Sequence, residues 1–217
     1  MLRIIQVISF GTREFDPSHL PSVSENEIHA FHSWKEQNST LPLALEIGPG
    51  VGMHPIKFAR ENPTKCLVAV EHTREKYEKF NRRFLNHNSP SNLLPVHANA
   101  ISWAHHILPK KSLNECFILY PNPSPKKSDL SKRWHAMPFM ERLLEILAPN
   151  ATLTLATNMA FYEKEACDWL SLYWGLELED RQELTQRNWQ MSQHRTHFER
   201  KYLQRGEICY NLIFKKR

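Results

Sequence analysis

A glycine-rich turn that follows a short apolar run constrains the fold of this chain more than any other feature. Residues 43–47 are Leu-Ala-Leu-Glu-Ile, a run that stops at Gly48, as a strand buried in a parallel sheet does. The turn is Gly48-Pro49-Gly50-Val51-Gly52, and residues 53–60 then have the pattern of a helix. Glycines let a backbone approach a ligand closely, and the following helix offers free N–H groups. The pattern indicates either a ligand-binding turn or a plain tight turn.

The rest of the chain alternates between short apolar runs and helical segments. Pro95 predicts that the third strand lies at a sheet edge, because proline cannot donate to a strand ladder. Alternating strands and helices are typical of parallel β-α-β units. We therefore expect an α/β fold with a doubly wound, mostly parallel, seven-stranded Rossmann-like sheet and helices on both faces. The expected strands are 43–47, 66–70, 93–98, 116–120, 152–157, 176–179 and 208–214, and the expected helices are 53–60, 73–84, 137–147 and 161–173.

Residues 1–40 are mixed and polar, and they predict a loose N-terminal extension before a single domain at 41–217. Within the extension, Ser24 and Glu27 have capping-box spacing, which indicates a helix start. The opening residues 1–8 lack a charged leader and a cleavage site, so they do not resemble a signal peptide. No apolar run is long enough to cross a bilayer. We expect a cytoplasmic protein without a membrane segment.

Composition adds two expectations. Cys66, Cys116, Cys167 and Cys209 lie far apart and include no pair at metal-ligand spacing, which predicts reduced core thiols and no metal site. The formal net charge of +5 suits a polyanionic partner, although many proteins this basic bind no nucleic acid.

The spacing of the glycines and of two acids indicates which ligand the turn would take. A dinucleotide-binding turn would have its third glycine at position 53, which is methionine here. Glu71 ends the second expected strand, 23 positions after Gly48, where an acid usually accepts from ribose hydroxyls. The Gly-x-Gly-x-Gly spacing, with Glu46 two residues ahead, resembles the first motif of class I methyltransferases.

This resemblance implies S-adenosyl-L-methionine as the cofactor. Glu46 would accept from its ammonium, Glu71 from its ribose, and Gly48, Gly50 and Gly52 would let it approach the backbone. Asn99 follows the third expected strand, where it would either meet the adenine or cap a loop.

Three further segments resemble the bacterial tRNA (guanine-N7-)-methyltransferases. Residues 120–127, Tyr-Pro-Asn-Pro-Ser-Pro-Lys-Lys, followed by Ser131-Lys132-Arg133, are similar to the family's Phe-Pro-Asp-Pro-Trp segment and its basic continuation. Residues 156–158 are similar to its Ala-Thr-Asp, and residues 195–199, Arg-Thr-His-Phe-Glu, to its Thr-x-Phe-Glu guanosine-binding motif. With the glycine turn, the resemblance runs from about Leu43 to the C-terminus.

The resemblance implies methyl transfer to N7 of a guanosine in tRNA. Asn122 would be the catalytic residue, between the cofactor and the base, with Lys126, Asn158, Thr196, Phe198 and Glu199 holding the guanosine. Glu199 would contact its Watson–Crick edge, and Phe198 would either stack on the base or fill the core. The chain departs from the family at Asn99, Asn122 and Asn158, where the family has Asp, and at Ser124, where it has Trp.

Three basic clusters are candidate phosphate contacts, or else solvated basic faces. They are Lys126, Lys127, Lys132 and Arg133; Arg195, Arg200, Lys201 and Arg205; and Lys215, Lys216 and Arg217.

Other functions stay open on the sequence. Asn122 between prolines is similar to the Asn-Pro-Pro-Tyr motif of amino-group methyltransferases, although no aromatic residue follows two places on. The three Asn substitutions are also compatible with a tRNA- or cofactor-binding homologue that has lost catalysis. A methyltransferase acting on small molecules is a further alternative. Either a monomer or a homodimer is expected.

Overall fold

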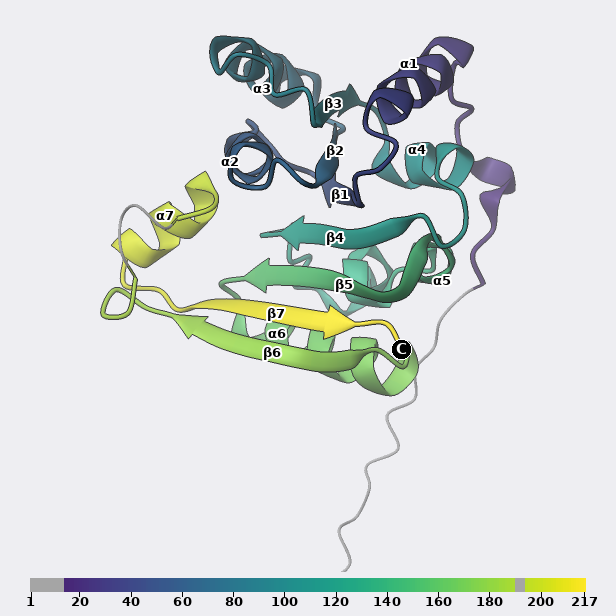
Figure 1. Ribbon diagram of the computed structural model, residues 1–217. Coiled ribbons are helices and arrows are strands. Elements are labelled where there is room, and N and C mark those ends of the chain that lie inside the picture. Colours follow the sequence, from purple (N-terminus) through teal and green to yellow (C-terminus); the bar gives the residue numbers. More distant parts are fainter. Residues whose placement is uncertain (1–13, 190–193) are drawn as a thin grey trace, which may run out of the picture.

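The seven strands form one sheet in the order β3-β2-β1-β4-β5-β7-β6 (Figure 1). The computed structural model describes residues 14–189 and 194–217, so the apolar opening at 1–8 lies outside it. Neighbouring strands are parallel from β3 to β5, and β7 runs antiparallel to both β5 and β6. The strands are β1 Leu43–Ile47, β2 Cys66–Glu71, β3 Leu93–His97, β4 Leu113–Leu119, β5 Leu147–Thr157, β6 Glu177–Leu184 and β7 Cys209–Lys215. This confirms the predicted mostly parallel, doubly wound α/β sheet.

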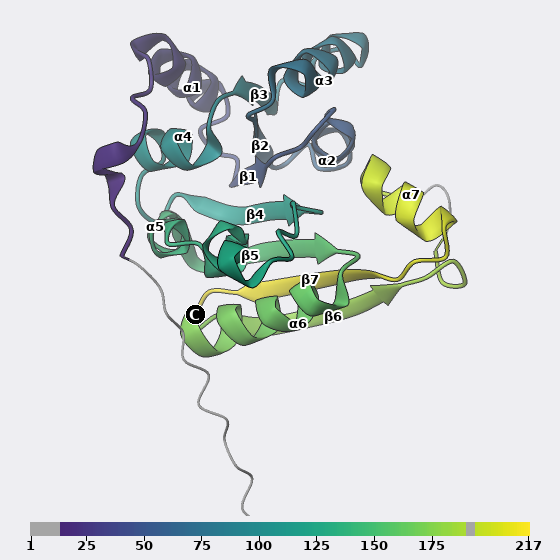
Figure 2. The same cartoon turned by 180° about the vertical axis from the view of Figure 1, so that it is seen from behind.

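Successive residues of the buried strands point to opposite faces of the sheet, so both faces are apolar. Helices cover both of them (Figures 1 and 2). Leu43, Leu45 and Ile47 of β1 face the core formed with α1, α4, α5 and α6. Ala44 faces the smaller core formed with α2 and α3. The helices are α1 Glu25–Gln37, α2 Met53–Glu61, α3 Arg74–Asn86, α4 Ala100–Ile107, α5 Phe139–Ile146, α6 Ala160–Asp168, which continues as a π-helical turn at Trp169–Tyr173, and α7 His197–Gln204.

The N-terminal helix α1 begins where its capping box predicts. The side chain of Ser24 accepts from the backbone N–H of Glu27, and the Glu27 carboxylate accepts from the Ser24 N–H. The expectation of a loose segment is wrong for this helix, because Phe31 is buried and packs edge-on against Trp103 with ring centroids 5.4 Å apart. The proposed domain boundary near residue 40 stays a prediction.

Two helices were not predicted. The helix α4 has 8 residues, of which five are buried, and it is too short to show a helical period in the sequence. The helix α7 is only 8 residues long. Strand β5 also starts at Leu147, several residues before the predicted start, and α5 ends at Ile146.

The strand order reverses between β1 and β4, so the connections from their carboxyl ends leave in opposite directions. Open α/β sheets bind ligands at such a switch point. The glycine turn leaves β1 there, and the proline-rich segment leaves β4. Figures 1 and 2 show that α7 lies on the side of the sheet where the parallel strands have their carboxyl ends.

Within residues 14–189 and 194–217, no helix has the length and apolarity needed to cross a membrane. The same part of the chain contains no group of three His, Cys, Asp or Glu side chains suited to a metal ion. All four cysteines are free thiols, as predicted, and three of them are buried.

Candidate active site

The glycine turn is left-handed at all three of its glycines. The φ angles are 71° at Gly48, 62° at Gly50 and 77° at Gly52. A Cβ built on Gly48 or Gly50 would meet no atom within 4 Å, so the backbone there faces open space. A Cβ on Gly52 would lie 1.9 Å from Cδ2 of Phe80. Gly48 and Gly50 therefore leave a bare backbone surface at the turn, whereas Gly52 is required for packing.

The carboxylate of Glu71 holds this turn in place. Its Oε2 accepts from the N–H of Gly50 at 2.9 Å, and its Oε1 accepts from the N–H of Thr73 at 2.7 Å. The side chain is buried at the carboxyl end of β2. Each carboxylate oxygen has a second lone pair. Glu71 can accept further hydrogen bonds from a ligand over the turn.

The second acid, Glu46, pairs with a histidine that was not predicted. Glu46 is 2% exposed, and its Oε2 lies 2.8 Å from Nδ1 of His54, in the first turn of α2. The helix α2 has no side-chain cap at Gly52, so its first N–H groups receive no capping hydrogen bond from a side chain at the turn. His54 could have been anticipated, since the first turn after a ligand-binding loop faces the strand end.

A small cavity joins the glycine turn to α7. Its walls come from the end of β1, the turn, the start of α2 and the N-terminal residues of α7. The lining residues are Glu46, Gly48, Pro49, Gly50, Val51, Met53, His54, Leu119, Thr196, His197 and Phe198. The structure thus brings together two motifs that lie about 150 residues apart in the sequence.

Glu199 anchors α7 rather than facing the cavity. It is 1% exposed, and its Oε2 accepts from Nε and Nη2 of Arg195 at 3.0 and 2.7 Å and from the hydroxyl of Tyr120 at 2.9 Å. Its Oε1 accepts from the Arg195 N–H at 2.9 Å. Burial raises the pKa of Glu199, but the charge and hydrogen bonds of Arg195 outweigh this and leave the pKa below its ordinary value.

These contacts change the predicted roles of two residues. A direct contact between Glu199 and a base would require a rearrangement of α7, because the side chain is 1% exposed and does not line the cavity. Arg195 also donates from Nη1 to Asn211 of β7 at 2.7 Å. The assignment of Arg195 to a phosphate-binding cluster is therefore wrong, because its charge is already paired inside the protein.

The other residues of the α7 motif have distinct environments. The Thr196 hydroxyl caps the helix by accepting from the N–H of Glu199 at 3.0 Å. Phe198 is 45% exposed and lies parallel to Tyr202, with ring centroids 6.1 Å apart. The prediction that Phe198 fills the core is therefore wrong. Its other predicted role, stacking on a base, stays a prediction.

The proline-rich segment after β4 has a strained backbone. Tyr120 and Ser124 have φ angles of 53° and 44°, a region that costs non-glycine residues about 1 kcal/mol or more. Asn122 is exposed, and its Oδ1 accepts from the N–H of Ser124 at 3.1 Å. Lys126 is exposed as well.

Arg133 holds this segment from within. It is 3% exposed, donates to the carbonyl oxygens of Ser124 at 3.0 Å and Lys126 at 3.1 Å, and pairs with Glu165. Its predicted contact with phosphate is therefore wrong, because the guanidinium is buried and its three nitrogens all contact protein oxygens. The sequence shows only a basic run, which does not distinguish the buried arginine from the exposed lysines beside it.

The side chains of the third basic cluster also have partners within the protein. Lys216 donates to the carbonyl oxygens of Leu144 and Leu147 at 2.6 and 2.8 Å, at the end of α5. Lys215 and Arg217 pair with Glu179 and Glu177 of β6. The prediction that this cluster binds RNA has no support in these contacts.

Like Asn122, the other two Asn substitutions have specific hydrogen-bond partners. Asn99 caps α4, its Oδ1 accepting from the N–H groups of Ile101 and Ser102 at 3.0 and 3.2 Å. Asn158 donates from Nδ2 to Oε2 of Glu207 at 2.7 Å. Glu207 precedes β7 and was not predicted, and no local pattern marks it. Within the described residues, Asn99, Asn122, Lys126 and Asn158 do not line the cavity beside the glycine turn.

In comparisons with known proteins, the chain matches a methyltransferase family and individual tRNA methyltransferases. Residues 40–212 match the family described as "Putative methyltransferase". A tRNA (guanine-N(7)-)-methyltransferase of Cereibacter sphaeroides is 27% identical over 175 residues, covering 81% of this chain and 70% of the relative. One of Acidithiobacillus ferrooxidans is 31% identical over 156 residues, covering 71% and 67%.

Solved structures support the fold independently. The 16S rRNA methyltransferase KamB superposes with a TM-score of 0.64 at 20% identity, covering 94% of this chain and 99% of KamB. A SAM-dependent methyltransferase from Aquifex aeolicus gives a TM-score of 0.55 at 14% identity, covering 93% and 99%.

Proposed function

The chain belongs to the tRNA (guanine-N(7)-)-methyltransferase family, and from that membership we propose that it methylates N7 of a guanosine in tRNA. One observation carries the proposal. The glycine turn that suits the cofactor and the Thr196-His197-Phe198 segment that suits the base line the same cavity. We further propose that residues 41–217 form the methyltransferase domain, that 1–40 extend it, and that it acts in the cytoplasm.

The side chains at the glycine turn fit S-adenosyl-L-methionine. Glu71 has lone pairs for the ribose diol, and the bare backbone at Gly48 and Gly50 leaves room for a ligand above the turn. The uncapped start of α2 suits its carboxylate, and Glu46 suits its ammonium if His54 gives way. When bound, the cofactor supplies an electrophilic methyl group on a sulfonium sulfur.

The protein's own task at the base is orientation. Guanine N7 carries a lone pair and no proton, so the residues need to hold the base and exclude water rather than remove a proton. The exposed ring of Phe198 offers a stacking face beside the glycine turn. Glu199, with Tyr120 and Arg195, is a positioning residue that fixes α7 and therefore this ring.

Methylation makes the base cationic, so a nearby negative charge assists the reaction. We assign that charge to Glu207, which hydrogen-bonds to Asn158, where the family has Asp. An amide at 158 beside a carboxylate at 207 preserves one negative charge in the pair. Asn122 keeps the shape of the family's Asp and one acceptor, but loses the charge.

The test of the proposed activity is methyl transfer to unmodified bulk tRNA from methyl-labelled S-adenosylmethionine, followed by digestion and identification of the labelled nucleoside. We expect the label in N7-methylguanosine. Label in an exocyclic amine would support the amino-group alternative instead. Binding of both cofactor and tRNA with no label would leave a binding protein.

The assignment of Glu207 has its own test. Glu207→Gln should lower kcat/KM about tenfold to a hundredfold, the equivalent of about 1.5–3 kcal/mol for a lost charged contact. Asn158→Asp with Glu207→Gln should restore most of this loss, because the charge then lies on the other partner. If Glu207→Gln leaves kcat/KM unchanged while the protein is folded, the charge is not used.

A further inference from the structure

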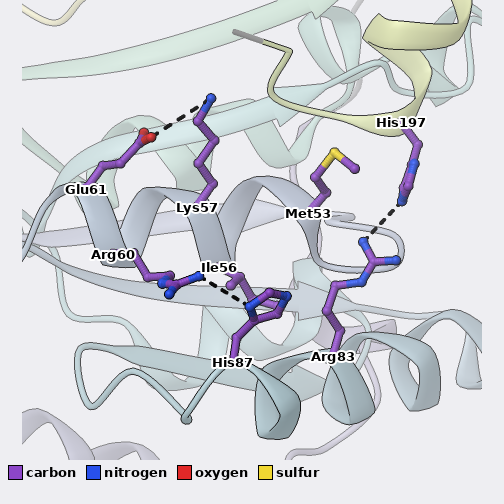
Figure 3. Close-up of a pocket in the computed structure, with 8 residues that line it drawn as sticks. All are labelled: Met53, Ile56, Lys57, Arg60, Glu61, Arg83, His87 and His197. Carbon is purple, nitrogen blue, oxygen red and sulfur yellow. Dashed lines mark hydrogen bonds and ion pairs between the residues drawn. The ribbon is translucent and has the colours of Figure 1, made fainter. Parts of the chain in front are cut away.

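A second, larger cavity lies between α2 and α3, outside the site described above (Figure 3). Its volume is about 620 Å³. A neighbouring hollow of about 400 Å³ shares Arg83 and His87 with it and adds Val51, Lys79, Arg82 and Asn86. The residues lining the larger cavity are Met53, Ile56, Lys57, Arg60, Glu61, Arg83, His87 and His197.

The walls of this double cavity are strongly basic. They carry five Lys or Arg side chains, two histidines and one carboxylate, that of Glu61. Within residues 14–189 and 194–217, Arg60, Arg82 and Arg83 have no carboxylate at ion-pair distance. Their charges therefore remain uncompensated at the surface.

Histidine rings orient two of these arginines. Nη1 of Arg60 lies 3.3 Å from Nδ1 of His87, and Nη1 of Arg83 lies 3.1 Å from Nε2 of His197 (Figure 3). An imidazole that accepts such a bond fixes the guanidinium without neutralising it. Burial lowers the pKa of His197, and the charges of Arg83 and Arg200 lower it further, so this ring stays an acceptor at neutral pH. The remaining N–H groups of each arginine are left for an oxyanion.

The basic cavity adjoins the candidate active site. Met53 and His197 line both the larger cavity and the small cavity beside the glycine turn. His197 also lies next to Phe198, the proposed stacking residue. A chain of phosphates bound along α2 and α3 would therefore lead directly to a base held at α7.

We propose that the groove formed by Arg60, Arg82, Arg83 and His87 binds consecutive phosphates of the tRNA whose guanosine enters the small cavity beside the glycine turn. This inference rests on the proposed function, and it adds a substrate-binding surface that the α7 and proline-rich motifs do not include. The volumes of the two adjoining cavities, about 620 and 400 Å³, and the distribution of basic residues over both favour a polyanion over a single phosphate.

A simpler explanation exists for two of these charges. Arg60 and Arg83 lie in the last turns of α2 and α3, where cations stabilise the helix dipole. That role alone would make their substitution cost stability and leave tRNA affinity unchanged, which separates the two explanations.

The test is the double variant Arg60→Gln/Arg83→Gln, with tRNA affinity measured by filter binding over a range of salt concentrations. We expect affinity to fall about tenfold or more near 0.1 M salt, and the slope of log K against log salt to decrease by about 2. Cofactor affinity should not change. In the methylation assay, KM for tRNA should rise while kcat is retained. Arg60→Lys/Arg83→Lys should preserve most of the salt slope.

The matched control is Lys110→Gln/Arg217→Gln, which removes the same charge from residues that do not line the groove. Both side chains are already paired, with Glu145 and Glu177. If the groove variant and the control bind tRNA alike, the inference is overturned. It is also overturned if inorganic phosphate stabilises the wild type but not the groove variant while tRNA affinity is equal. Wild-type protein that binds tRNA without transferring methyl would contradict the proposed function and leave this binding test intact.

Discussion

At the scale of single residues, the three glycines of one turn answer to different constraints. All three adopt left-handed φ angles, which cost other residues about 1–2 kcal/mol. Only Gly52 also lacks room for a side chain, because the ring of Phe80 occupies that space. One short glycine pattern therefore combines an open backbone surface at Gly48 and Gly50 with a packing requirement at Gly52.

This difference predicts that two substitutions in the turn have unequal effects on stability. Gly52→Ala should lower the free energy of unfolding by about 3 kcal/mol or more, since overpacking adds to the backbone strain. Gly50→Ala should lower it by only about 1–2 kcal/mol and should mainly weaken cofactor binding. Urea denaturation and calorimetric titration with S-adenosylmethionine measure the two effects. Equal losses of stability would show that Phe80 can move aside.

At the scale of elements, α7 owes its place to one buried ion pair. Glu199 of α7 is bound to Arg195, which in turn bonds Asn211 of β7, and Tyr120 at the end of β4 completes the set. Removing one partner of a buried pair is costly, because the other charge is left without compensation.

Glu199→Gln should therefore lower the free energy of unfolding at pH 7 by about 2–3 kcal/mol, less than a fully buried pair because Arg195 is 24% exposed. The folded-state pKa of Glu199 lies below its ordinary 4.5, so its contribution is present above about pH 4.5 and is lost as pH falls through the lower, folded-state pKa. Urea denaturation from pH 3 to pH 7 should show a shallower acid loss in the variant.

The control for this pair lies on the same helix. Lys201 is exposed, so Lys201→Gln should change stability by no more than about 0.5 kcal/mol. If Glu199→Gln behaved like Lys201→Gln, α7 would be held by its other contacts instead.

At the scale of the whole molecule, one buried histidine links stability to pH. His135 is fully buried, and its Nδ1 has no hydrogen-bond partner among the described residues. Burial lowers its pKa to about 4, against an opposing effect of Glu165 and with a smaller lowering by Arg133. The folded protein therefore resists protonation of this ring, whereas the unfolded chain accepts the proton near pH 6.5.

Stability should consequently fall as pH decreases from about 6.5 to about 4, by up to about 1.4 kcal/mol per pH unit. Above pH 6.5 this contribution is complete, since the ring is neutral in both states. His135→Gln keeps a donor toward Glu165 and removes the titration, so its stability should vary less over the same window. Urea denaturation at pH 4.5, 5.5 and 7 provides the comparison, and parallel curves for the two proteins would contradict the assignment.

Local patterns along the chain are sufficient to predict the layers of this protein. Apolar runs of four to eight residues, punctuated by glycine and proline, predict buried parallel strands, and the edge position of β3 follows from Pro95. The turn after β1 and its acid at Glu71 were also readable, because both are local features at strand ends. The helices α4 and α7 were not, since each has only 8 residues and shows no clear helical period.

The sequence does not show which basic side chains remain unpaired and accessible to a ligand, because that depends on tertiary packing. Arg133 and Arg195 read as surface cations in the sequence, yet each is bound to a carboxylate inside the protein. Arg60 and Arg83 attract no notice in the sequence, yet they line an open basic cavity. The physical reason is that the fate of a charge depends on its partners and burial. Those are set by packing between helices and strands far apart in the chain, and not by the spacing of neighbouring residues.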